Sequence, residues 1–392
     1  MEQKKPRLLV LLSRVPYPLD KGDKLRAYQQ ILGLSKNFRI ILVCLNIGQV
    51  SPKAFNHLNP ICENVHVIRL NRFSIYWRLI LNIFKDKPYQ IAYFYSKEAH
   101  KELDIIIEKY LPQRFYCQLI RVAEYAKKYS IFEKNLDYMD ALSAGMQRRI
   151  ETAPFYLKPI LKSEANRLLK YEEEIFSHFE KKTIISKFDR EHINHPNSSE
   201  IKVIPNGISP DYFENLNQVK TNDICFTGNM SYPPNVEGAS YLVKNILPLL
   251  SNSQDVKVLI SGKSPSVIVK RLAHDNIEVT GWVDDMRMSY AESKIFVAPM
   301  IIGSGLQNKL LEAMAQGIPC ITSSLANEAL GAQDKEEILI ANTPEEFATY
   351  IEDLLKSEEK RNYIGKRGQL YVKNNFSWKY WNAELIQFLT NK

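Results

Sequence analysis

The sequence lacks the marks of a cross-linked, secreted or membrane-spanning protein. Its five cysteines are scattered, without the paired spacing of a zinc site or a disulfide framework. No apolar stretch approaches the roughly 20 residues that a helix needs to cross a bilayer. The apolar run near the amino terminus is too short for a signal peptide and is expected to form a core strand. We therefore expect a cytoplasmic protein whose cysteines are buried thiols in a reducing compartment.

Metal-binding and nucleophilic motifs are scarce as well. No Asp-x-Asp pattern occurs at an expected strand end, although Asp284 and Asp285 are adjacent. His178, His192 and His195 lie near an expected linker and give little support to a metal site. No clear nucleophile–base pair stands out, which suits a mechanism without an enzyme nucleophile.

Length and composition indicate two ordinary globular domains. The chain has 392 residues, 45% of them hydrophobic and 24% charged, so each of two domains of roughly 200 residues can form a core. The formal net charge is +8. That charge is compatible with nucleic acid, an anionic membrane or a phosphate-rich substrate, and equally with solubility alone.

Short apolar segments alternate with helical segments, which is typical of doubly wound parallel sheets. The expected strands are 7–12, 39–45, 65–70, 115–119, 135–138 and 183–186, then 223–227, 256–260, 277–280, 294–299 and 320–322. We expect one Rossmann-like domain at 1–190 and another at 200–375, joined by a polar linker. The aromatic segment 376–392 is expected to pack back on the first domain. Two such domains facing each other would form a cleft for a nucleotide-containing ligand.

The segment Gly303–Cys320 is the most informative part of the sequence. Ser304 and Gln307 have the spacing of a capping box, which predicts a helix that starts near Gly305. The later Gly317-Ile-Pro sequence predicts its end. With an apolar strand before and after it, this helix completes a strand–helix–strand unit, whose ligands bind beyond the carboxyl ends of the strands.

The two faces of this expected helix differ. The apolar face would pack on the sheet and consists of Leu306, Leu310 and Met314. The polar face consists of Asn308, Lys309 and Glu312. Backbone N–H groups of Gly305 and Leu306 could hold a phosphate with help from Lys309, while Glu312 could accept hydrogen bonds from ribose hydroxyls. An ordinary amphipathic helix with a solvated lysine and glutamate is an equally open interpretation.

Several segments, in their order and spacing, carry a family resemblance. They are VPYPLDKGDKLRAYQQILGLS, VIPNGISPDYF, FTGNMSYPPNVEGASYLVKNILPLL, VTGWVDDMRMSYAESKIFVAPMIIGSGLQNKLLEAMAQGIPCITS and NNFSWKYW. Together they resemble the retaining glycosyltransferases of family 4, which have the GT-B fold of two Rossmann-like domains. GDK and GLQNKLLEAMA are similar to a bacterial subgroup associated with exopolysaccharide and capsule synthesis.

The resemblance implies a nucleoside-diphosphate sugar as co-substrate and no obligatory metal or other cofactor, since lysine and helix dipoles neutralise the diphosphate. It also implies that Glu312 binds the donor ribose. Many relatives carry two glutamates in an E-x7-E arrangement, but here Ser304 stands at the first position. The contact that the first glutamate makes with the transferred sugar must therefore be made otherwise, for example by backbone amides of residues 302–305.

Further donor-site residues follow expected strands. By resemblance, the loop of Gly281 frames the nucleotide base through backbone groups. Two interpretations of the tryptophan in this loop stay open, a base contact or a core side chain. The donor-site residues that we expect are Gly22, Asp23, Lys24, Gly228, Asn229, Gly262, Trp282, Val283, Gly303, Ser304, Gly305, Leu306 and Asn308.

On the first domain, the loop of Gly22 precedes a helix for which Asp23 is well placed as N-cap. Lys24 and Arg26 could reach phosphate or acceptor, and a plain capped turn is the alternative. Arg121 is expected to anchor phosphate or acceptor and, with Lys309 and Glu312, completes the expected catalytic set; a surface arginine is as consistent. Asp137 and Asp140 could accept a proton from the acceptor, with helix capping as the default.

We therefore predict a retaining, nucleoside-diphosphate-sugar-dependent glycosyltransferase of cell-surface polysaccharide synthesis. Its acceptor would be a glycan or a lipid-linked glycan, and no nucleic-acid partner is expected. A sugar-nucleotide epimerase on the same fold, or a non-catalytic binding subunit, are the alternatives. The segment Arg72–Lys97 mixes aromatic and basic residues and could lie on the inner face of a membrane, or be a core helix with a loop.

Overall fold

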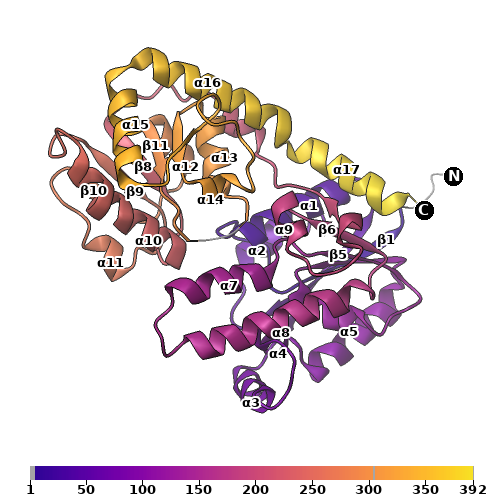
Figure 1. The fold of residues 1–392 in the computed structure, drawn as a ribbon. Helices are drawn as coiled ribbons and strands as arrows, with labels where there is room; N and C mark the ends of the chain where they lie inside the picture. The colour runs from indigo at the N-terminus through magenta and orange to yellow at the C-terminus, as the bar shows by residue number, and fades with distance from the viewer. Residues whose placement is uncertain (1–4, 303–304, 392) are drawn as a thin grey trace. The chain divides into compact units, whose positions relative to one another are not determined.

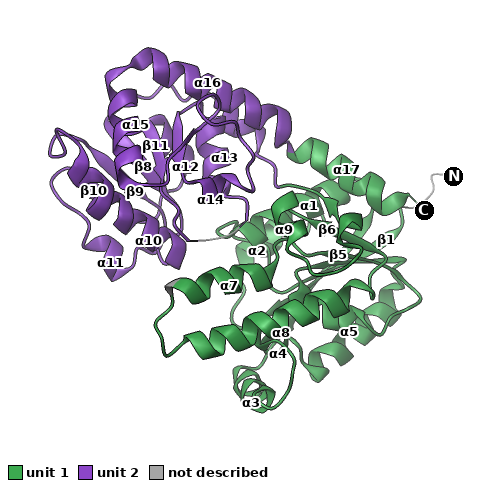
Figure 2. Ribbon diagram, viewed as in Figure 1, with its two compact units in different colours: residues 1–205, 378–392 green, residues 206–377 purple. Residues whose placement is uncertain are grey.

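The computed structural model describes residues 5–302 and 305–391, which fall into two compact units (Figure 2). Unit 1 contains the chain up to Pro205 together with the last helix, from Trp378 onward. Unit 2 contains Asn206–Ser377. The segment expected as a linker lies within unit 1, because Ile193 and Ile201 are buried in the core of that unit. The chain therefore leaves unit 1 later than the polar composition of residues 191–200 indicated.

Unit 1 is built on a seven-stranded sheet in the order β3-β2-β1-β4-β5-β6-β7. All neighbouring pairs are parallel, with Leu8 opposite Ile40 on one side of β1 and opposite Arg114 on the other. The strands are β1 (Arg7–Leu12), β2 (Arg39–Asn46), β3 (Asn64–Arg69), β4 (Arg114–Gln118), β5 (Glu133–Asp137), β6 (Lys181–Ile184) and the short β7 (Lys202–Val203).

Helices cover both faces of this sheet, so the central strands are near-continuous apolar runs (Figure 1). The helices are α1 (Gly22–Leu34), α2 (Pro52–Leu58), α3 (Arg72–Asn82), α4 (Tyr89–Phe94), α5 (Lys97–Tyr110), η1 (Ile120–Val122), α6 (Ala123–Ala126), α7 (Leu142–Thr152), α8 (Lys158–Phe176), α9 (Lys187–Glu191), η2 (Ser198–Glu200) and α17 (Trp378–Thr390). The last of these packs on α1, where Asn382 Nδ2 donates to the carbonyl of Gln29 at 2.9 Å.

Unit 2 is built on a six-stranded parallel sheet in the order β10-β9-β8-β11-β12-β13. The strands are β8 (Asn222–Thr227), β9 (Val258–Ser261), β10 (Ile277–Val279), β11 (Ser293–Ala298), β12 (Cys320–Thr322) and β13 (Leu339–Ile340). The helices are η3 (Pro210–Phe213), α10 (Pro233–Tyr241), η4 (Leu242–Ile246), η5 (Leu247–Leu249), α11 (Val267–Lys270), α12 (Met286–Ala291), α13 (Asn308–Ala315), α14 (Ser324–Asn327), α15 (Pro344–Lys356) and α16 (Glu358–Asn375). The expected fold class, two doubly wound parallel α/β domains, is confirmed.

The helical segment after β8 changes type along its length. It starts as α10, widens into the π turn η4 and tightens into the 3₁₀ turn η5. Pro248 lacks the amide hydrogen for an α-helical bond to Lys244, so a regular helix cannot continue to its end.

Strand order reverses at one point in each sheet, between β1 and β4 and between β8 and β11. In open parallel sheets, ligands bind beyond the carboxyl ends of the strands at this switch point. In unit 2 it brings together Thr227 at the end of β8 and the segment that follows Ala298 at the end of β11. Across residues 5–302 and 305–391, every helix is too short or too polar to traverse a bilayer.

Candidate active site

Three glycines follow the carboxyl ends of β8, β9 and β10, and we call them the glycine edge: Gly228, Gly262 and Gly281. Backbone hydrogen bonds connect them across the sheet. The amide of Gly228 donates to Ser261 and that of Gly262 donates to Gly281, both at 3.0 Å. The sequence predicted each glycine at a strand end, and the sheet places the three in adjacent positions.

Close backbone approach requires glycine at the middle of this edge. The φ of Gly262 is +141°, and a Cβ there would lie 1.8 Å from the carbonyl oxygen of Gly228. Gly228 itself has a φ of +152°, and a Cβ there would meet the side chain of Asn235 at 2.6 Å. No side chain fits in this space, so the backbone can approach a ligand closely at the end of β8.

The helix after β11 starts later than predicted. α13 begins at Asn308, with Gln307 as an extended N-cap whose side chain makes no capping bond. Gly305 has a left-handed φ of +72°, which a residue in the first turn of a right-handed helix cannot adopt. The start near Gly305 is therefore wrong, and the first-turn amides are those of Asn308 and Lys309 rather than of Gly305 and Leu306. Gly303 and Ser304 lie outside the described residues.

The end and the apolar face of α13 are as predicted. Gly317 has a φ of +71°, its amide donates to Met314 at 2.9 Å, and that of Ile318 donates to Ala313 at 3.3 Å, which closes the helix. Leu310 and Met314 are fully buried, and Leu306 packs against the same core. The helix is therefore fixed on the sheet, with its first turn beside the switch point.

Lys309 is buried rather than solvated. Its Nζ donates to Asn235 Oδ1, lies 3.6 Å from Met300 Sδ and sits 4.7 Å from the centre of the Phe226 ring. Burial lowers the pKa of Lys309 to about 7, against the opposite effect of the Glu312 charge. A group of this kind takes up a proton readily when an anion arrives, because the anion restores the favourable charge pairing that burial removed.

Glu312 lies one turn further along α13 and belongs to a hydrogen-bonded chain. The Tyr290 hydroxyl on α12 donates to Glu312 Oε2 at 2.8 Å and lies 2.7 Å from Thr227 Oγ1. Because the single hydroxyl proton of Tyr290 goes to Glu312, Thr227 is the donor in the second bond. Desolvation raises the pKa of Glu312 to about 7, with the Tyr290 bond and the Lys309 charge opposing the rise. The partly exposed carboxylate keeps capacity to accept further hydroxyls.

The expected shared polar face is in fact divided among three partners. Asn308 Oδ1 accepts from Asn206 Nδ2 at 3.0 Å, while Lys309 and Glu312 contact Asn235 and Tyr290. None of these three partners was predicted from the sequence. No local pattern connects positions so far apart in the chain.

Asn235 joins the turn after β8 to the start of α13. Its Nδ2 donates to the carbonyl of Asn229 at 3.0 Å, and its Oδ1 accepts from Lys309. Asn229 Oδ1 in turn accepts from the amide and hydroxyl of Ser231 at 3.2 and 2.9 Å. The conformation of the turn and the position of Lys309 are thus coupled through one buried amide.

The position of the tryptophan in the loop after β10 decides between its two interpretations. Trp282 is 63% exposed, so the interpretation as a core side chain is wrong. Its Nε1 donates to Asp284 Oδ1 at 2.9 Å, which holds the indole over the loop rather than in the sheet. Asp285 caps α12 by accepting from the amide of Arg287 at 3.0 Å, so these adjacent aspartates have separate structural tasks.

In unit 1, the loop before α1 differs from expectation. α1 begins at Gly22 with Lys21 as N-cap, so the assignment of Asp23 as N-cap is wrong. Asp23 lies inside the first turn and pairs with Arg14 at 3.1 Å, where its charge also suits the helix dipole. Lys24 pairs with Asp20 at 2.9 Å. Both side chains therefore have local partners at this end of the helix.

Arg26 cannot contact a ligand, contrary to expectation. It is fully buried and forms a bidentate ion pair with Asp137, at 2.7 and 2.9 Å. It also donates to the carbonyl of Ile204 at 2.9 Å. Thr183 Oγ1 donates to the same carboxylate at 3.1 Å. Asp137 is thus fully engaged and is excluded as an acceptor base in this conformation.

Arg121 and Asp140 lie beyond the carboxyl ends of β4 and β5. Arg121 Nε donates to Gln90 Oε1 at 2.9 Å, and its guanidinium sits 5.7 Å from the centre of the Phe94 ring. Burial raises the pKa of Asp140, and the nearby Asp189 carboxylate adds to the rise. Asp140 is therefore the carboxyl group at this strand end that could exchange a proton near neutral pH.

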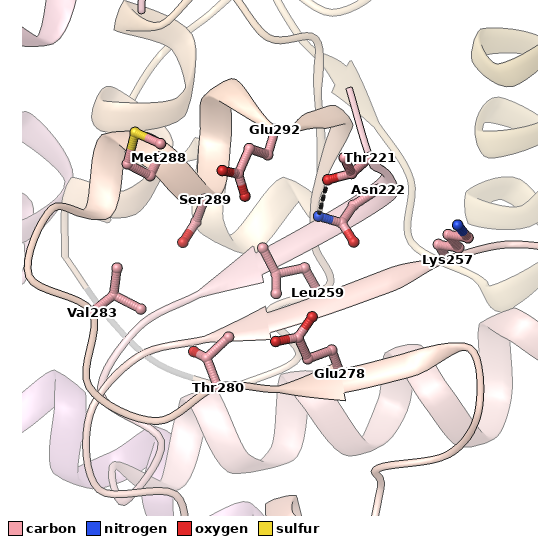
Figure 3. A pocket seen from close by; sticks show the side chains of 10 residues that line it. All are labelled: Thr221, Asn222, Lys257, Leu259, Glu278, Thr280, Val283, Met288, Ser289 and Glu292. Carbon is pink, nitrogen blue, oxygen red and sulfur yellow. Dashed lines mark hydrogen bonds between the residues drawn. The ribbon is translucent and has the colours of Figure 1, made fainter. Parts of the chain in front are cut away.

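A pocket of about 400 Å³ lies along β8–β10 beside α12 (Figure 3). It contains one predicted donor residue, Val283, together with hydroxyls and carboxylates. The lining consists of Thr221, Asn222, Lys257, Leu259, Glu278, Thr280, Val283, Met288, Ser289 and Glu292. Thr221 and Lys257 precede β8 and β9, so the pocket extends towards the amino ends of the strands, away from the switch point.

No group of three or more His, Cys, Asp or Glu side chains suited to a metal ion occurs within the part of the chain that the structure describes. Lys309 supplies a positive charge near the switch point of unit 2 when it is protonated. The first-turn amides of α13 add a partial positive charge there.

Solved structures with this architecture include GT-B glycosyltransferases, and this chain has the GT-B fold. HepE from Anabaena, solved in complex with UDP and glucose, has a TM-score of 0.71 to this chain, with 13% identity over 98% of this chain and 99% of that one. Residues 221–357, from β8 to α15, match the family described as "Glycosyl transferases group 1". The protein therefore carries a group 1 glycosyltransferase domain in unit 2.

Two relatives match nearly the whole chain. An uncharacterized 44.6 kDa protein in the cps region of Klebsiella pneumoniae is 21% identical over 95% of this chain and 97% of its own length. The glycosyltransferase MJ1069 of Methanocaldococcus jannaschii is 23% identical over 89% of this chain and 88% of its own length. The family resemblance inferred from the motifs is confirmed.

Proposed function

We propose that this glycosyltransferase moves a sugar from a nucleoside-diphosphate donor to a hydroxyl group of a glycan or lipid-linked acceptor, with retention of configuration. One observation carries the proposal. At the switch point of unit 2, the buried Lys309 and the partly exposed Glu312 lie one turn apart at the start of α13. A cation for the diphosphate and an acceptor for ribose hydroxyls are thus held at the position where such folds bind nucleotides.

The neighbouring elements supply the remaining contacts for the donor. The diphosphate would lie against the glycine edge and the first-turn amides of α13, where the helix dipole favours an anion. The base would lie at the loop of Trp282 and Val283, whose backbone groups can read its edge. The structure of Anabaena HepE in complex with UDP-glucose supports a uridine donor as the first to test.

The chemistry needs charge stabilisation rather than an enzyme nucleophile. The bond between the anomeric carbon and the diphosphate oxygen breaks, and the acceptor oxygen forms its bond from the same side. The acceptor proton passes to the departing phosphate. Lys309 and the α13 amides stabilise the negative charge that grows on the diphosphate as it leaves. Removing one such donor typically lowers the turnover by about 10²- to 10³-fold.

The relatives suggest the biological setting. The Klebsiella protein is named for its position in a cps region, and structural neighbours include WaaG, a glycosyltransferase involved in lipopolysaccharide biosynthesis. These names support an acceptor in cell-surface polysaccharide synthesis. The +8 net charge is compatible with substrates that carry phosphate.

A panel of nucleoside-diphosphate sugars tests the proposal. Release of the nucleoside diphosphate is measured for the wild type, Lys309→Met and Glu312→Gln, with Glu328→Gln, an exposed glutamate outside α13, as the matched control. We expect turnover with one donor class, a loss of about 10²-fold or more for Lys309→Met, and a raised donor KM for Glu312→Gln. The configuration at the new linkage is read by nuclear magnetic resonance.

Three results would replace the proposal. Donor binding without turnover on any donor in the presence of cell extract would indicate a binding subunit. An epimerised nucleotide sugar would indicate an epimerase. An inverted linkage would support a glycosyltransferase but exclude the retaining mechanism.

A further inference from the structure

Helix α3 presents its apolar side to solvent. Six large side chains recur every three or four residues from its first turn to just past its end, and we call them the α3 stripe: Phe73, Tyr76, Trp77, Ile80, Leu81 and Phe84. All six are exposed, Phe73 by 79%, Trp77 by 62% and Phe84 by 88%. Residues at this spacing share one helix face, so the exposure is that of a continuous surface. Soluble proteins rarely leave such a surface uncovered.

The inner side of the same helix is more polar than the outer side. Asn82 is buried, and its Nδ2 donates to the carbonyl of Lys87 at 2.7 Å. Arg78 is half-buried, and its Nη2 lies 3.3 Å from the carbonyl of Tyr93. Ile75 is buried, and the half-buried Leu79 packs against the same core. Most of the large apolar side chains of the helix nevertheless lie on its outer side, unlike the usual arrangement of a surface helix.

Hydrogen bonds fix α3 in this orientation. Asn71 caps its start by accepting from the amide of Phe73 at 2.8 Å. At its end, Arg167 of α8 donates to the carbonyls of Asn82 and Lys87 at 2.9 and 3.2 Å. The helix also packs on α4, on the outside of unit 1 (Figure 1). The stripe is therefore a property of the folded unit rather than of a helix that could roll inward.

The charged residues of the segment that contains the stripe are mostly basic. Between Glu63 and Glu98 the only carboxylate is Asp86, whereas the same stretch carries Arg69, Arg72, Arg78, Lys85, Lys87 and Lys97. Arg72 and Lys85 are exposed at the two ends of the stripe. A second copy of this chain would present the same basic residues to them, with Asp86 as the one carboxylate within the segment. An anionic bilayer surface offers phosphate groups to those cations and an acyl boundary to the aromatic rings.

We propose that α3 docks unit 1 on an anionic lipid surface, lying in the plane of the interface. The α3 stripe would enter the boundary between headgroups and acyl chains, and Arg72 and Lys85 would contact lipid phosphates. Tyr76 and Trp77 suit this position because their rings are apolar and their polar tips stay hydrated. The inference rests on unit 1 alone and does not require that the proposed transfer reaction is correct.

Flotation of the full-length protein with vesicles tests the inference without donor or acceptor. The vesicles are phosphatidylcholine alone, or phosphatidylcholine mixed with phosphatidylglycerol. We expect the wild type to float with the mixed vesicles and to dissociate as salt is raised. Phe73→Ser/Trp77→Ser should lower the partition coefficient by at least about tenfold. Ile131→Ser, which changes a residue of unit 1 that is 86% exposed outside the stripe, is the matched control and should leave binding unchanged.

The charge contribution is tested with Arg72→Gln/Lys85→Gln against Lys53→Gln, an exposed lysine of α2. Removing the pair should weaken binding at low salt by roughly tenfold or more, because two cations that attract the anionic surface are lost. All the changed residues are exposed, so circular dichroism and the melting temperature should match the wild type.

Two outcomes would overturn the inference. One is equal binding of the wild type and Phe73→Ser/Trp77→Ser to the mixed vesicles, or no binding by either. The other is a wild-type dimer in sedimentation equilibrium that becomes monomeric in Phe73→Ser/Trp77→Ser, which would show that a second copy covers the stripe.

Discussion

The ammonium group of Lys309 donates a hydrogen bond to the side-chain oxygen of Asn235, which in turn holds the carbonyl of Asn229. This arrangement connects the start of α13 with the turn after β8, the two segments that flank the switch point of unit 2. A diphosphate that attracts Lys309 therefore competes with Asn235 for the same protons. The strength of the Lys309–Asn235 contact should set how readily the lysine becomes available to the donor.

Asn235→Asp tests that competition. A carboxylate in place of the amide would form an ion pair with Lys309 and lose the bond to the Asn229 carbonyl. We expect a donor KM raised by about tenfold or more, because an ion pair with the carboxylate would hold the ammonium group more strongly than the neutral amide does, and the diphosphate must displace it. Initial rates over a range of donor concentrations measure it. Asn252→Asp, a change at an exposed residue of the same unit, is the control and should leave the donor KM unchanged. An unchanged KM for Asn235→Asp would show that the diphosphate does not compete with Asn235 for Lys309.

Donor affinity should depend on pH near neutrality. Lys309 has a pKa lowered to about 7, so its ammonium form, which the diphosphate needs, declines as pH rises through that value. Glu312 has a pKa raised to about 7, so its ability to accept two ribose hydroxyls declines as pH falls. A bell-shaped profile of kcat/KM for the donor should result. Glu312→Gln should remove the acidic limb, and a profile with both limbs intact in that variant would contradict the assignment.

The lowered pKa of Lys309 also predicts how the stability of the folded state changes with pH. Below pH 7 the folded state carries a charged, desolvated Lys309, and this cost disappears as pH rises from about 7 towards the model-peptide value of 10.5. Lys309→Met should therefore exceed the wild type in free energy of unfolding at pH 7 and below, with a difference that shrinks at alkaline pH. Urea unfolding at several pH values measures it. A difference that is constant with pH would show that Lys309 is not perturbed by burial.

The contact between Gly262 and Gly228 should tolerate no side chain. Gly262→Ala places a Cβ 1.8 Å from the Gly228 carbonyl oxygen and forces a non-glycine residue to a φ of +141°. We expect a loss of several kcal/mol in the free energy of unfolding, or an insoluble product. Gly48→Ala is the control, since a Cβ at Gly48 meets nothing within 4 Å. Similar melting temperatures for the two variants would refute the close packing of the glycine edge.

The ion pair of Arg26 and Asp137 should be a structural requirement of unit 1. Arg26→Met leaves a fully buried carboxylate without its charge partner and should cost about 3–5 kcal/mol in the free energy of unfolding. Arg26→Met/Asp137→Leu removes both charges and should recover most of that loss. Chemical denaturation of the wild type, Arg26→Met, Asp137→Leu and the double variant gives the coupling energy. If the loss in free energy of unfolding of the double variant equals the sum of the losses of the single variants, Arg26 and Asp137 do not stabilise each other.

Much of the fold could be predicted from local sequence. The strands are short apolar runs because parallel strands are covered on both faces, so β1 and β12 have the predicted bounds and the other core strands shift by only a few residues. Glycines at strand ends and the Gly317 stop are equally local signals, since they reflect the backbone freedom of single residues.

Predictions failed where a local signal had a stronger competitor. The capping box at Ser304 and Gln307 predicted an early start of α13, but the left-handed backbone of Gly305 prevents it. Asp23 looked like an N-cap, whereas its partner is Arg14. Arg26 looked like a phosphate ligand because it follows the loop of Gly22, and its true partner lies on a strand more than a hundred residues away.

The sequence by itself determined the two parallel α/β units, the glycines at the strand ends and the identity of Lys309 and Glu312 as site candidates. Those conclusions rest on hydrophobic pattern, backbone freedom and motif order, which are properties of neighbouring residues. Only the tertiary structure decided that Asn235 and Tyr290 hold those two side chains, and that α3 turns its aromatic side to solvent. Burial and hydrogen-bond partners depend on which segments meet in space, and no local pattern encodes that.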